Sequence, residues 1–405
     1  MNRPRPKLLE TTPAGLHCPI GGFYIDPFRP VDRAVITHGH SDHARWGSRH
    51  YLSASPGEPI LRMRLSEEAE FEFLDYGQKT TVGGVRVSLH PAGHMLGSAQ
   101  VRLEYRGEVA VVTGDYKLQS DATCDDFEPI RCHTFVTEST FGLPIYQWRE
   151  DSEIFADINQ WWRTAASEGK CCLLYGYAVG KSQRLLSGLD PSIGPIYTHG
   201  AVEKGVQAYR ESGVKLPETT SVTRRIETEA ANAGKSTSGE VTKRRKSSRA
   251  AKLDWSGSMV VAVPSAHGTP WMRKFGTVST AMASGWMAIR GARRRRAVDR
   301  GFVLSDHVDW PGLMNAIVWS EADEIWVTHG STAVVSRYLN EGGLQQRLQD
   351  HRSRSDWQHR RETLSAREIQ SYWESTPGDD VSSENALPGN ESTNESGDGG
   401  KPTSG

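Results

Sequence analysis

Cysteine is scarce in this 405-residue chain, and none of its five cysteines forms a Cys-x-x-Cys pair. The spacing therefore excludes a zinc ribbon, and an odd number of cysteines argues against a full disulfide framework. We expect reduced thiols, which are typical of a protein that works in the cytoplasm.

Long apolar runs are also absent from the sequence. No uninterrupted stretch approaches the roughly 20 apolar residues that a membrane helix requires, so we predict no membrane segment. The first seven residues are basic, but no apolar signal core follows them. The sequence shows no internal repeat. These absences favour a cytoplasmic protein, and the length leaves room for two domains.

Neither sign of charge dominates the whole chain, which has a formal net charge of −1. Residues 376–405, however, hold six acidic side chains and one lysine. Removing the net −5 of this tail leaves +4 on the rest of the chain. We predict that the tail is disordered and solvated. Basic residues cluster at 243–246 and at 293–296.

The pattern of apolar residues changes near Trp148. From about residue 16 to 138, short apolar runs with glycine and proline between them predict strands. Beyond Trp148, helical spacing at 154–166 alternates with strand-like runs at 171–177 and 259–264, which predicts an α/β unit with parallel strands. A polar stretch at about 224–252 interrupts this unit, and we interpret it as a mobile basic insertion.

Four candidate metal ligands lie within six residues, in His38-Gly-His40-Ser-Asp42-His43. The apolar run 34–37 that precedes them predicts a strand. Alternation along an extended segment would place His38, His40 and Asp42 on one face, with His43 reaching the same point from a turn. Imidazoles and a carboxylate are ligands that suit zinc.

Three further segments end an apolar run with a ligand-type residue. They present His94 between glycines, Asp115 after a buried run, and His329 in Val-Thr-His-Gly. A single His or Asp at the end of a strand is more often a turn or packing residue than a metal ligand. Together with the first cluster they supply seven candidate ligands, which is enough for two zinc ions.

These segments resemble the successive motifs of the metallo-β-lactamase fold. Glu138 in Thr-Glu-Ser-Thr, His307 in Leu-Ser-Asp-His and His329 resemble the three additional motifs of the β-CASP nucleases. That branch includes Artemis-like DNA nucleases, ribonuclease J and the cleavage and polyadenylation endonuclease. Artemis-like members have an aliphatic residue at the last motif, so His329 favours the metal site of the other two.

The similarity is greatest to a bacterial subgroup, the exonucleases associated with ATP-dependent DNA ligases, which are also described as mRNA 3′-end processing factors. It is carried by Cys18-Pro-x-Gly-Gly-Phe-Tyr-Ile-Asp-Pro, by residues 90–100 and 138–144, by Gly180-Lys-Ser-Gln-Arg, and by residues 300–310. The resemblance extends from about residue 8 to residue 339.

The resemblance implies an α/β protein, a metallo-β-lactamase αβ/βα sandwich with an inserted β-CASP α/β domain. The sandwich would comprise residues 1–147 and 300–350. The β-CASP cap would comprise residues 148–299 and form the far wall of a nucleic-acid cleft.

The resemblance also implies roles for the site residues, with two Zn²⁺ as cofactors and Mn²⁺ as the alternative. His38, His40 and His94 would hold one ion, and Asp42, His43 and His329 the other, with Asp115 bridging them. His307 would protonate the leaving 3′-oxygen, and Glu138 would orient His307 or a ligand imidazole. Asp42, His307 and Glu138 are thus the predicted catalytic residues. Asp32, six residues before His38, is either a residue that orients a ligand or an ordinary surface carboxylate.

Basic residues of the cap are candidates for contact with the nucleic-acid backbone. The predicted contacts are Lys181, Arg290, Arg293, Arg294, Arg295 and Arg296. Solvent-exposed charge is an equally good interpretation for Lys181 and Arg290. Trp271 and Trp286 could stack on bases, or could belong to the core.

We therefore predict a DNA exonuclease that acts in repair with an ATP-dependent DNA ligase and a helicase as partners. An RNA-processing nuclease is the alternative within the family. A small-molecule metallohydrolase, such as a thioesterase or lactonase, would not need the cap or His307. A catalytically silent nucleic-acid-binding module would not need every ligand position to be occupied, as they are in this chain.

Overall fold

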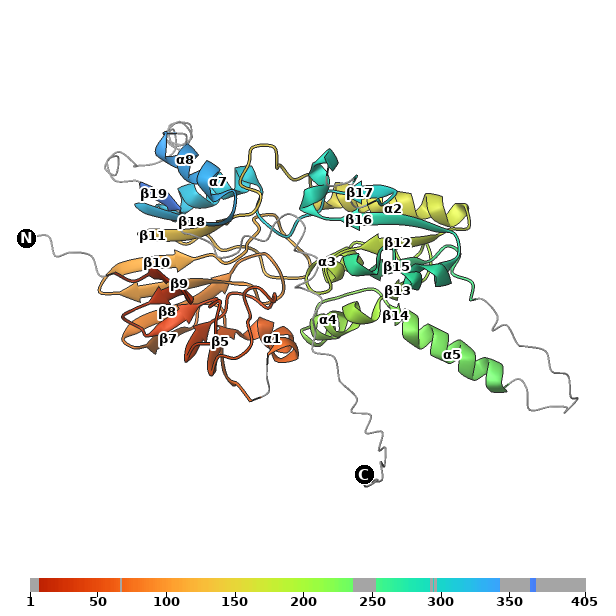
Figure 1. Cartoon of the computed structure of the whole chain (residues 1–405), viewed down its shortest axis with the longest axis horizontal. Coiled ribbons are helices and arrows are strands. Elements are labelled where there is room, and N and C mark those ends of the chain that lie inside the picture. Colours follow the sequence, from red (N-terminus) through yellow and green to blue (C-terminus); the bar gives the residue numbers. More distant parts are fainter. Residues whose placement is uncertain are drawn as a thin grey trace, which may run out of the picture.

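The computed structural model describes residues 7–65, 68–235, 253–291, 294, 297–342 and 365–368. Figure 1 shows two bodies side by side, a β-rich one on the left and an α/β one on the right. We call them the sandwich and the cap. The acidic tail predicted at residues 376–405 lies outside the described residues.

The first sheet of the sandwich has six strands arranged in sequence order. The first two pairings are antiparallel and the next three are parallel. Its strands are β1 (Glu10–Thr12), β2 (Gly15–Cys18), β3 (Phe23–Ile25), β4 (Arg33–Val35), β5 (His50–Ala54) and β6 (Glu70–Leu74).

The second sheet has seven strands in the order β19-β18-β11-β10-β9-β8-β7. An antiparallel meander, β7 to β10, continues through parallel pairings to β11, β18 and β19. Its strands are β7 (Lys79–Val82), β8 (Val85–Pro91), β9 (Ala99–Tyr105), β10 (Glu108–Val112), β11 (Thr134–Ser139), β18 (Glu324–Gly330) and β19 (Ser365–Glu368).

The two sheets enclose one apolar core and helices cover their outer faces. Alternation along β10 places Ala110 and Val112 in the core between the sheets, whereas Val111 packs beneath the helices on the other side. The covering helices are α1 (Glu58–Arg64, after η1 at Ser55–Gly57) on the first sheet, and α7 (Trp310–Ser320) and α8 (Thr332–Asn340) on the second. This layering agrees with the predicted αβ/βα sandwich.

The cap is built on a parallel sheet of six strands in the order β14-β13-β15-β12-β16-β17. The strands are β12 (Cys171–Tyr175), β13 (Ile196–Thr198), β14 (Thr220–Ser221), β15 (Met259–Ala262), β16 (Val278–Ala283) and β17 (Arg300–Phe302). The helices are α2 (Asp151–Ser167), α3 (Lys181–Ser187), α4 (Gly200–Glu211), α5 (Val222–Lys235), η2 (Pro264–Ala266), η3 (Pro270–Phe275) and η4 (Gly285–Ala288). The central strand β12 is completely buried, which explains its unbroken apolar run.

Three predicted boundaries need correction. Strand β17 begins at Arg300 and pairs with β16, so the cap continues beyond residue 299. Strand β19 lies beyond residue 350 and still extends the second sandwich sheet. The insertion predicted at 224–252 begins as part of helix α5, and residues 236–252 lie outside the described residues. A helix rich in charged and small residues looks like an irregular segment when only its composition is read.

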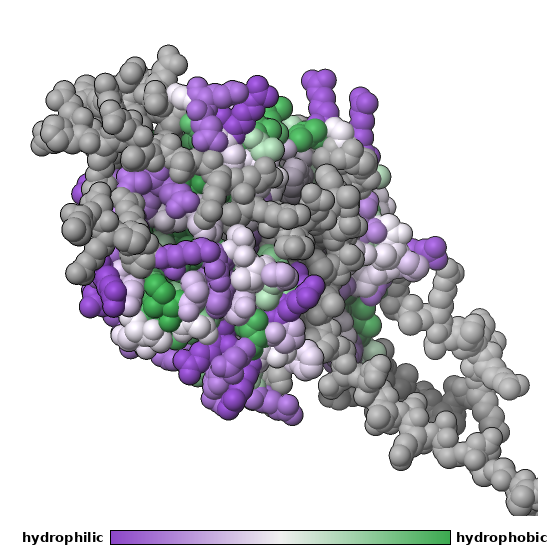
Figure 2. Space-filling model, turned by 60° about the vertical axis from the view of Figure 1, so that its left-hand side comes forward, coloured by the Kyte–Doolittle hydropathy of each residue, from purple (hydrophilic) through white to green (hydrophobic). Residues whose placement is uncertain are grey.

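The chain has a mean hydropathy of −0.55, which is typical of a protein with a hydrophilic surface. Figure 2 shows the sandwich side of the molecule, where hydrophilic side chains predominate and hydrophobic ones are scattered. In the part of the chain that is described, no helix is both long enough and apolar enough to span a membrane.

Candidate metal centre

The segment His38–His43 forms a turn, so the strand predicted for it is wrong. Strand β4 ends at Val35, and the amides of His43 and Ala44 both donate to the carbonyl of His40, at 3.2 and 2.8 Å. The side chains therefore converge because the backbone curls around one point. A strand and a tight turn both bring closely spaced residues together, and the sequence alone does not separate them.

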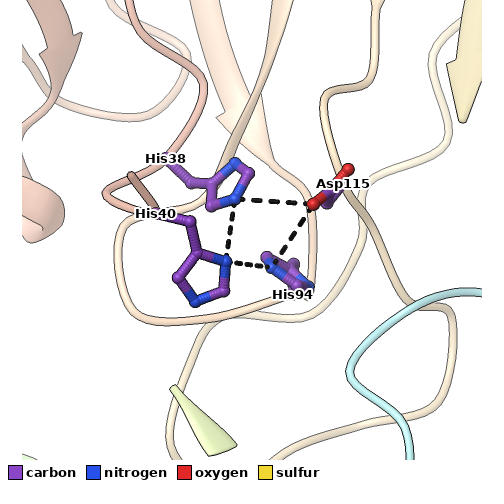
Figure 3. Close-up of side chains that lie close together, drawn as sticks. All are labelled: His38, His40, His94 and Asp115. Carbon is purple, nitrogen blue, oxygen red and sulfur yellow. Dashed lines mark hydrogen bonds and ion pairs between the residues drawn. The ribbon is translucent and has the colours of Figure 1, made fainter. Parts of the chain in front are cut away.

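Four ligand-type side chains from three loops meet at one point, namely His38, His40, His94 and Asp115 (Figure 3). Their ligand atoms all lie within 4.8 Å of one another. Nδ1 of His40 lies 3.1 Å from Nε2 of His38 and 3.1 Å from Nε2 of His94. Three imidazole nitrogens and a carboxylate are a donor set that fits zinc. The structure thus brings together four of the seven predicted ligands as one compact group.

Backbone carbonyls orient two of these imidazoles. The carbonyl of Val179, in the loop between β12 and α3, accepts from Nε2 of His40 at 3.2 Å. The carbonyl of Asp306, in the segment after β17, accepts from Nδ1 of His94 at 2.9 Å. Because a carbonyl can only accept, each imidazole donates there and keeps its other nitrogen free of a proton. Those other nitrogens are the ones that face the centre of the group.

Asp42, His43 and His329 lie beside this first group and are linked to it through Asp115. Nε2 of His43 lies 3.4 Å from Oδ2 of Asp115 and 3.6 Å from Oδ2 of Asp42. The ring of His329 stacks on His43 with centroids 5.5 Å apart, and the hydroxyl of Ser139 donates to the His329 carbonyl. Among the described residues, Oδ1 of Asp42 is buried and accepts no hydrogen bond. A cation bound here would satisfy such a buried carboxylate oxygen.

Burial lowers the pKa of His38, His40 and His94, because desolvation disfavours the imidazolium ion. Neutral imidazole is the form that binds a metal. Burial also opposes ionisation of His43, but the carboxylates of Asp115, Asp42 and Asp26 outweigh it and raise the pKa of this side chain. The excess of carboxylate charge around His43 is the kind of field that a divalent cation would balance.

Asp26 was missed by the sequence analysis, which put forward Asp32 instead. Asp26 accepts hydrogen bonds from Nδ1 of His43 at 2.7 Å and from the hydroxyl of Thr37 at 2.6 Å. That hydroxyl, having donated its only proton, accepts from Nδ1 of His38 at 3.1 Å. Asp26 therefore orients two candidate ligands, whereas Asp32 is 67% exposed and lies 4.0 Å from His50. A carboxylate directly after strand β3 was the available signal, as it was for Asp115 after β10.

Replacing Asp26 by asparagine is expected to weaken zinc binding by about 10- to 100-fold, because the imidazoles of His43 and His38 lose the acceptor that fixes their orientation. A chelator competition titration measures this. Asp32→Asn is the matched control and should bind zinc like the unaltered chain. Equal affinities for a folded Asp26→Asn variant and the control would show that Asp26 does not support the site.

Glu138, which is buried, and His307, whose side chain is 26% exposed, form a pair next to Asp115. Nδ1 of His307 lies 3.1 and 3.0 Å from the two carboxylate oxygens of Glu138, and the Tyr116 amide donates to Oε1 of Glu138 at 2.9 Å. Burial opposes ionisation of His307, but Glu138 and Asp115 raise its pKa to about 10. The imidazolium form is therefore favoured at neutral pH, and its Nε2 is the nitrogen not engaged by Glu138.

An aromatic cluster lies beside His307 where the sandwich meets the cap. The ring of Phe141 lies 5.9 Å from that of His307 and 4.8 Å from that of Trp286 in η4. The indole nitrogen of Trp148 donates to the His307 carbonyl at 2.8 Å. Trp286 is thus a packing residue, as is Trp271, whose ring contacts His199 and Phe275.

The predicted contacts with the nucleic-acid backbone have different outcomes. Lys181 is 3% exposed and its ammonium group pairs with Asp306 at 2.9 Å, which argues against a phosphate contact and corrects that prediction. Arg290 and Arg294 are exposed. Arg293, Arg295 and Arg296 lie outside the described residues.

No family model matches the chain. A probable DNA ligase of Opitutus terrae is 27% identical over 333 residues, which are 82% of this chain and 30% of the relative. Cleavage and polyadenylation specificity factor 73 of Drosophila melanogaster is 31% identical over 39% of this chain and 24% of its own length. Endoribonuclease YSH1 of Kluyveromyces lactis is 26% identical over 44% of this chain and 29% of its own length.

The chain thus spans about a quarter to a third of the length of the relatives it matches. The predicted resemblance to the branch that contains the polyadenylation endonuclease is confirmed by these relatives, and so is the fold class. Among solved structures, a protein of unknown function from Enterococcus faecalis V583 aligns with 74% of this chain and 75% of its own at a TM-score of 0.47 and 11% identity. That likeness is too distant to support an argument.

Proposed function

We propose that this chain is a metal-dependent phosphodiesterase acting on nucleic acid. The observation that carries the proposal is the position of Oδ2 of Asp115, which lies near His38 and His94 of one set of candidate ligands and near His43 of the other, next to the Glu138–His307 pair. A phosphodiester carries a negative charge that repels an attacking nucleophile, so its hydrolysis is accelerated by cations at the phosphoryl oxygens and by a proton for the leaving oxygen.

His38, His40 and His94 would hold one metal ion, and Asp42, His43 and His329 a second, with Asp115 shared between them. Zinc, with Mn²⁺ as the alternative, would neutralise charge on the phosphoryl group and lower the pKa of an attacking water. His307 would donate its Nε2 proton to the leaving 3′-oxygen. Glu138 would hold that imidazole in place through Nδ1 and favour its protonated form.

DNA is the proposed polymer, with exonucleolytic trimming in DNA repair alongside an ATP-dependent ligase as the proposed role. The support is the extent of the match: similarity to a probable DNA ligase covers 82% of the chain, both sandwich and cap. RNA processing is the second candidate, favoured by the names of the polyadenylation factor and the endoribonuclease, whose matches cover 39% and 44% of the chain. The Glu138–His307 pair and the cap favour both over a small-molecule hydrolase.

The test compares end-labelled single- and double-stranded DNA and RNA, incubated with metal-replete protein, with and without chelator. We expect DNA to be degraded, chelator to stop the reaction, and Asp42→Ala to be inactive while folded. Cleavage of neither polymer would sink the nuclease proposal, and degradation of RNA alone would establish the second candidate. Circular single-stranded DNA offers no end, so its resistance is expected of an exonuclease and its cleavage would assign endonucleolytic action.

A further inference from the structure

Six charged side chains form a largely buried network where the cap meets the sandwich. We call it the junction cluster, and its members are Lys117, Asp121, Asp151, Lys181, Arg184 and Asp306. Three are basic and three acidic, so the cluster is neutral as a whole. They come from the loop after Asp115, the first turn of α2, helix α3, and the segment between β17 and α7. None of them belongs to the candidate metal centre.

Arg184 is the centre of the cluster and is 2% exposed. Its guanidinium group donates to Oδ1 of Asp306 at 2.7 Å and to the Ser305 carbonyl at 2.5 Å. It also lies 3.0 Å from Oδ2 of Asp121 and donates to Oδ1 of Asp151 at 2.6 Å. The guanidinium group has five N–H donors in one plane, so it can serve these four acceptors at the same time. This side chain therefore joins the cap helix α3 to three segments: the loop after Asp115, the first turn of α2, and the segment between β17 and α7.

Lys181 holds the same segment one turn earlier on α3. Its ammonium group donates to the Leu304 carbonyl at 2.9 Å and pairs with Oδ2 of Asp306 at 2.9 Å. Both carboxylate oxygens of Asp306 are thus engaged by α3, one by Lys181 and the other by Arg184. The backbone of residues 304–306 is consequently fixed against the cap at two carbonyls as well as at a side chain.

This fixed segment touches the metal centre directly. The Asp306 carbonyl accepts from Nδ1 of His94, and the next residue is His307. On the opposite side, the Lys117 amide donates to the Ala92 carbonyl at 3.0 Å, two residues before His94. The loop that leads into α3 supplies the Val179 carbonyl, which accepts from His40. Two of the three imidazoles in the first group are therefore oriented by backbone that the junction cluster holds.

We propose that Arg184 and Lys181 are positioning residues for the first metal ion: through Asp306 they hold the acceptor that fixes the imidazole of His94, so that metal binding depends on the docked cap. The inference rests on the proposed metal-dependent function, and it assigns to buried cations of the cap a role in assembling the site on the sandwich. Among the described residues, the hydrogen-bond and ion-pair partners of both side chains are carboxylates and carbonyls of the junction, and none is a candidate metal-ligand atom.

The expected result of Arg184→Met is a fall of about 10- to 100-fold in zinc affinity at the first site, the size seen when an outer partner of a metal ligand is removed. Zinc affinity of the full chain is measured by chelator competition, a readout that does not depend on turnover. Zinc at the second site, held by Asp42, His43 and His329, should change much less. Arg184→Lys keeps the charge but not the fork of donors, so an intermediate affinity is expected.

Leu173→Ala is the matched control, because Leu173 is fully buried in the cap strand β12 and is not part of the junction cluster. It should lower the thermal stability of the metal-free chain while leaving zinc affinity close to that of the unaltered chain. An equal loss of affinity in this control would show that Arg184 acts only through general stability, and would overturn the inference. If Arg184→Met fails to fold, Asp306→Asn takes its place, since it removes the side-chain charge and keeps the carbonyl.

Failure of the two proposals can be told apart. Zinc bound by the unaltered chain and equally well by a folded Arg184 or Asp306 variant would overturn the positioning role alone. No zinc bound by the unaltered chain would overturn the metal-dependent function and the positioning role together. Weaker zinc binding in the Arg184 variant, with the Leu173 control unchanged, supports both.

Discussion

Replacement of Asp115 by alanine is expected to lower phosphodiester hydrolysis by at least about a thousandfold. Oδ2 of Asp115 lies 3.6 Å from Nε2 of His38, 3.4 Å from that of His43 and 3.8 Å from that of His94. These three imidazoles come from both sets of candidate ligands. Metal ions are worth several kcal/mol of transition-state stabilisation, and about 4 kcal/mol corresponds to a thousandfold in rate.

Initial rates on labelled DNA, together with the zinc content of the purified chain, test this prediction. Asp125→Ala is the control, because Asp125 is exposed and lies on the loop that follows Asp115. It should retain both activity and zinc. An Asp115→Ala variant that is folded and within tenfold of the unaltered rate would contradict the shared-ligand role of Asp115.

Replacement of His307 by alanine is expected to slow hydrolysis of DNA by about 10²- to 10⁴-fold, the usual contribution of a general acid. Zinc content should not change, because His307 engages Glu138 and is not one of the proposed ligands. Glu138→Gln should have a smaller effect in the same direction. It keeps the side-chain shape but removes the charge that favours the imidazolium ion.

Substrates with different leaving groups can distinguish whether His307 acts as a general acid or only as a packing residue. In a nitrophenyl phosphodiester, the nitrophenolate leaves without needing a proton. The loss of rate caused by His307→Ala should therefore largely disappear with this substrate. Asp42→Ala serves as the comparison, because a defect in metal binding should persist with either leaving group. An equal loss on both substrates would show that His307 supports the site in some way other than proton donation.

The ligand-type residues could be found from the sequence because they follow apolar runs. Such runs form strands, and the loops after the strands lie together at one edge of the sheet. The same rule would have found Asp26 after β3, had it been applied to a strand of only three residues. Asp32 lies only six residues before His38 in the sequence, but its side chain is 67% exposed and lies beside His50. Strand β4 lies between Asp32 and His38, so closeness in the sequence does not bring these two side chains together.

The buried charges were the least predictable part of the molecule. Lys181 and Arg184 occupy the start of a helix after a glycine-containing loop, a setting that also suits phosphate contacts. Their carboxylate partners are far away in the sequence: Asp121 and Asp151 precede them and Asp306 follows by more than a hundred residues. A buried ion pair depends on its partner, and a single sequence does not say which charges meet.

The pairing of β11 with β18 has a consequence for how quickly the chain folds. These strands align in parallel from Thr134 opposite Glu324 to Glu138 opposite Thr328, and the entire cap lies between them in the sequence. Contacts so distant in sequence are slow to form, because the entropy of closing the loop is lost before the sheet is gained. A cap that folds first shortens that loop, since Arg184 then joins the first turn of α2 to Ser305 and Asp306, just after β17. Strand β18, which carries His329 near its end, would then pair with β11. The second set of candidate ligands would therefore be complete only after this pairing has formed.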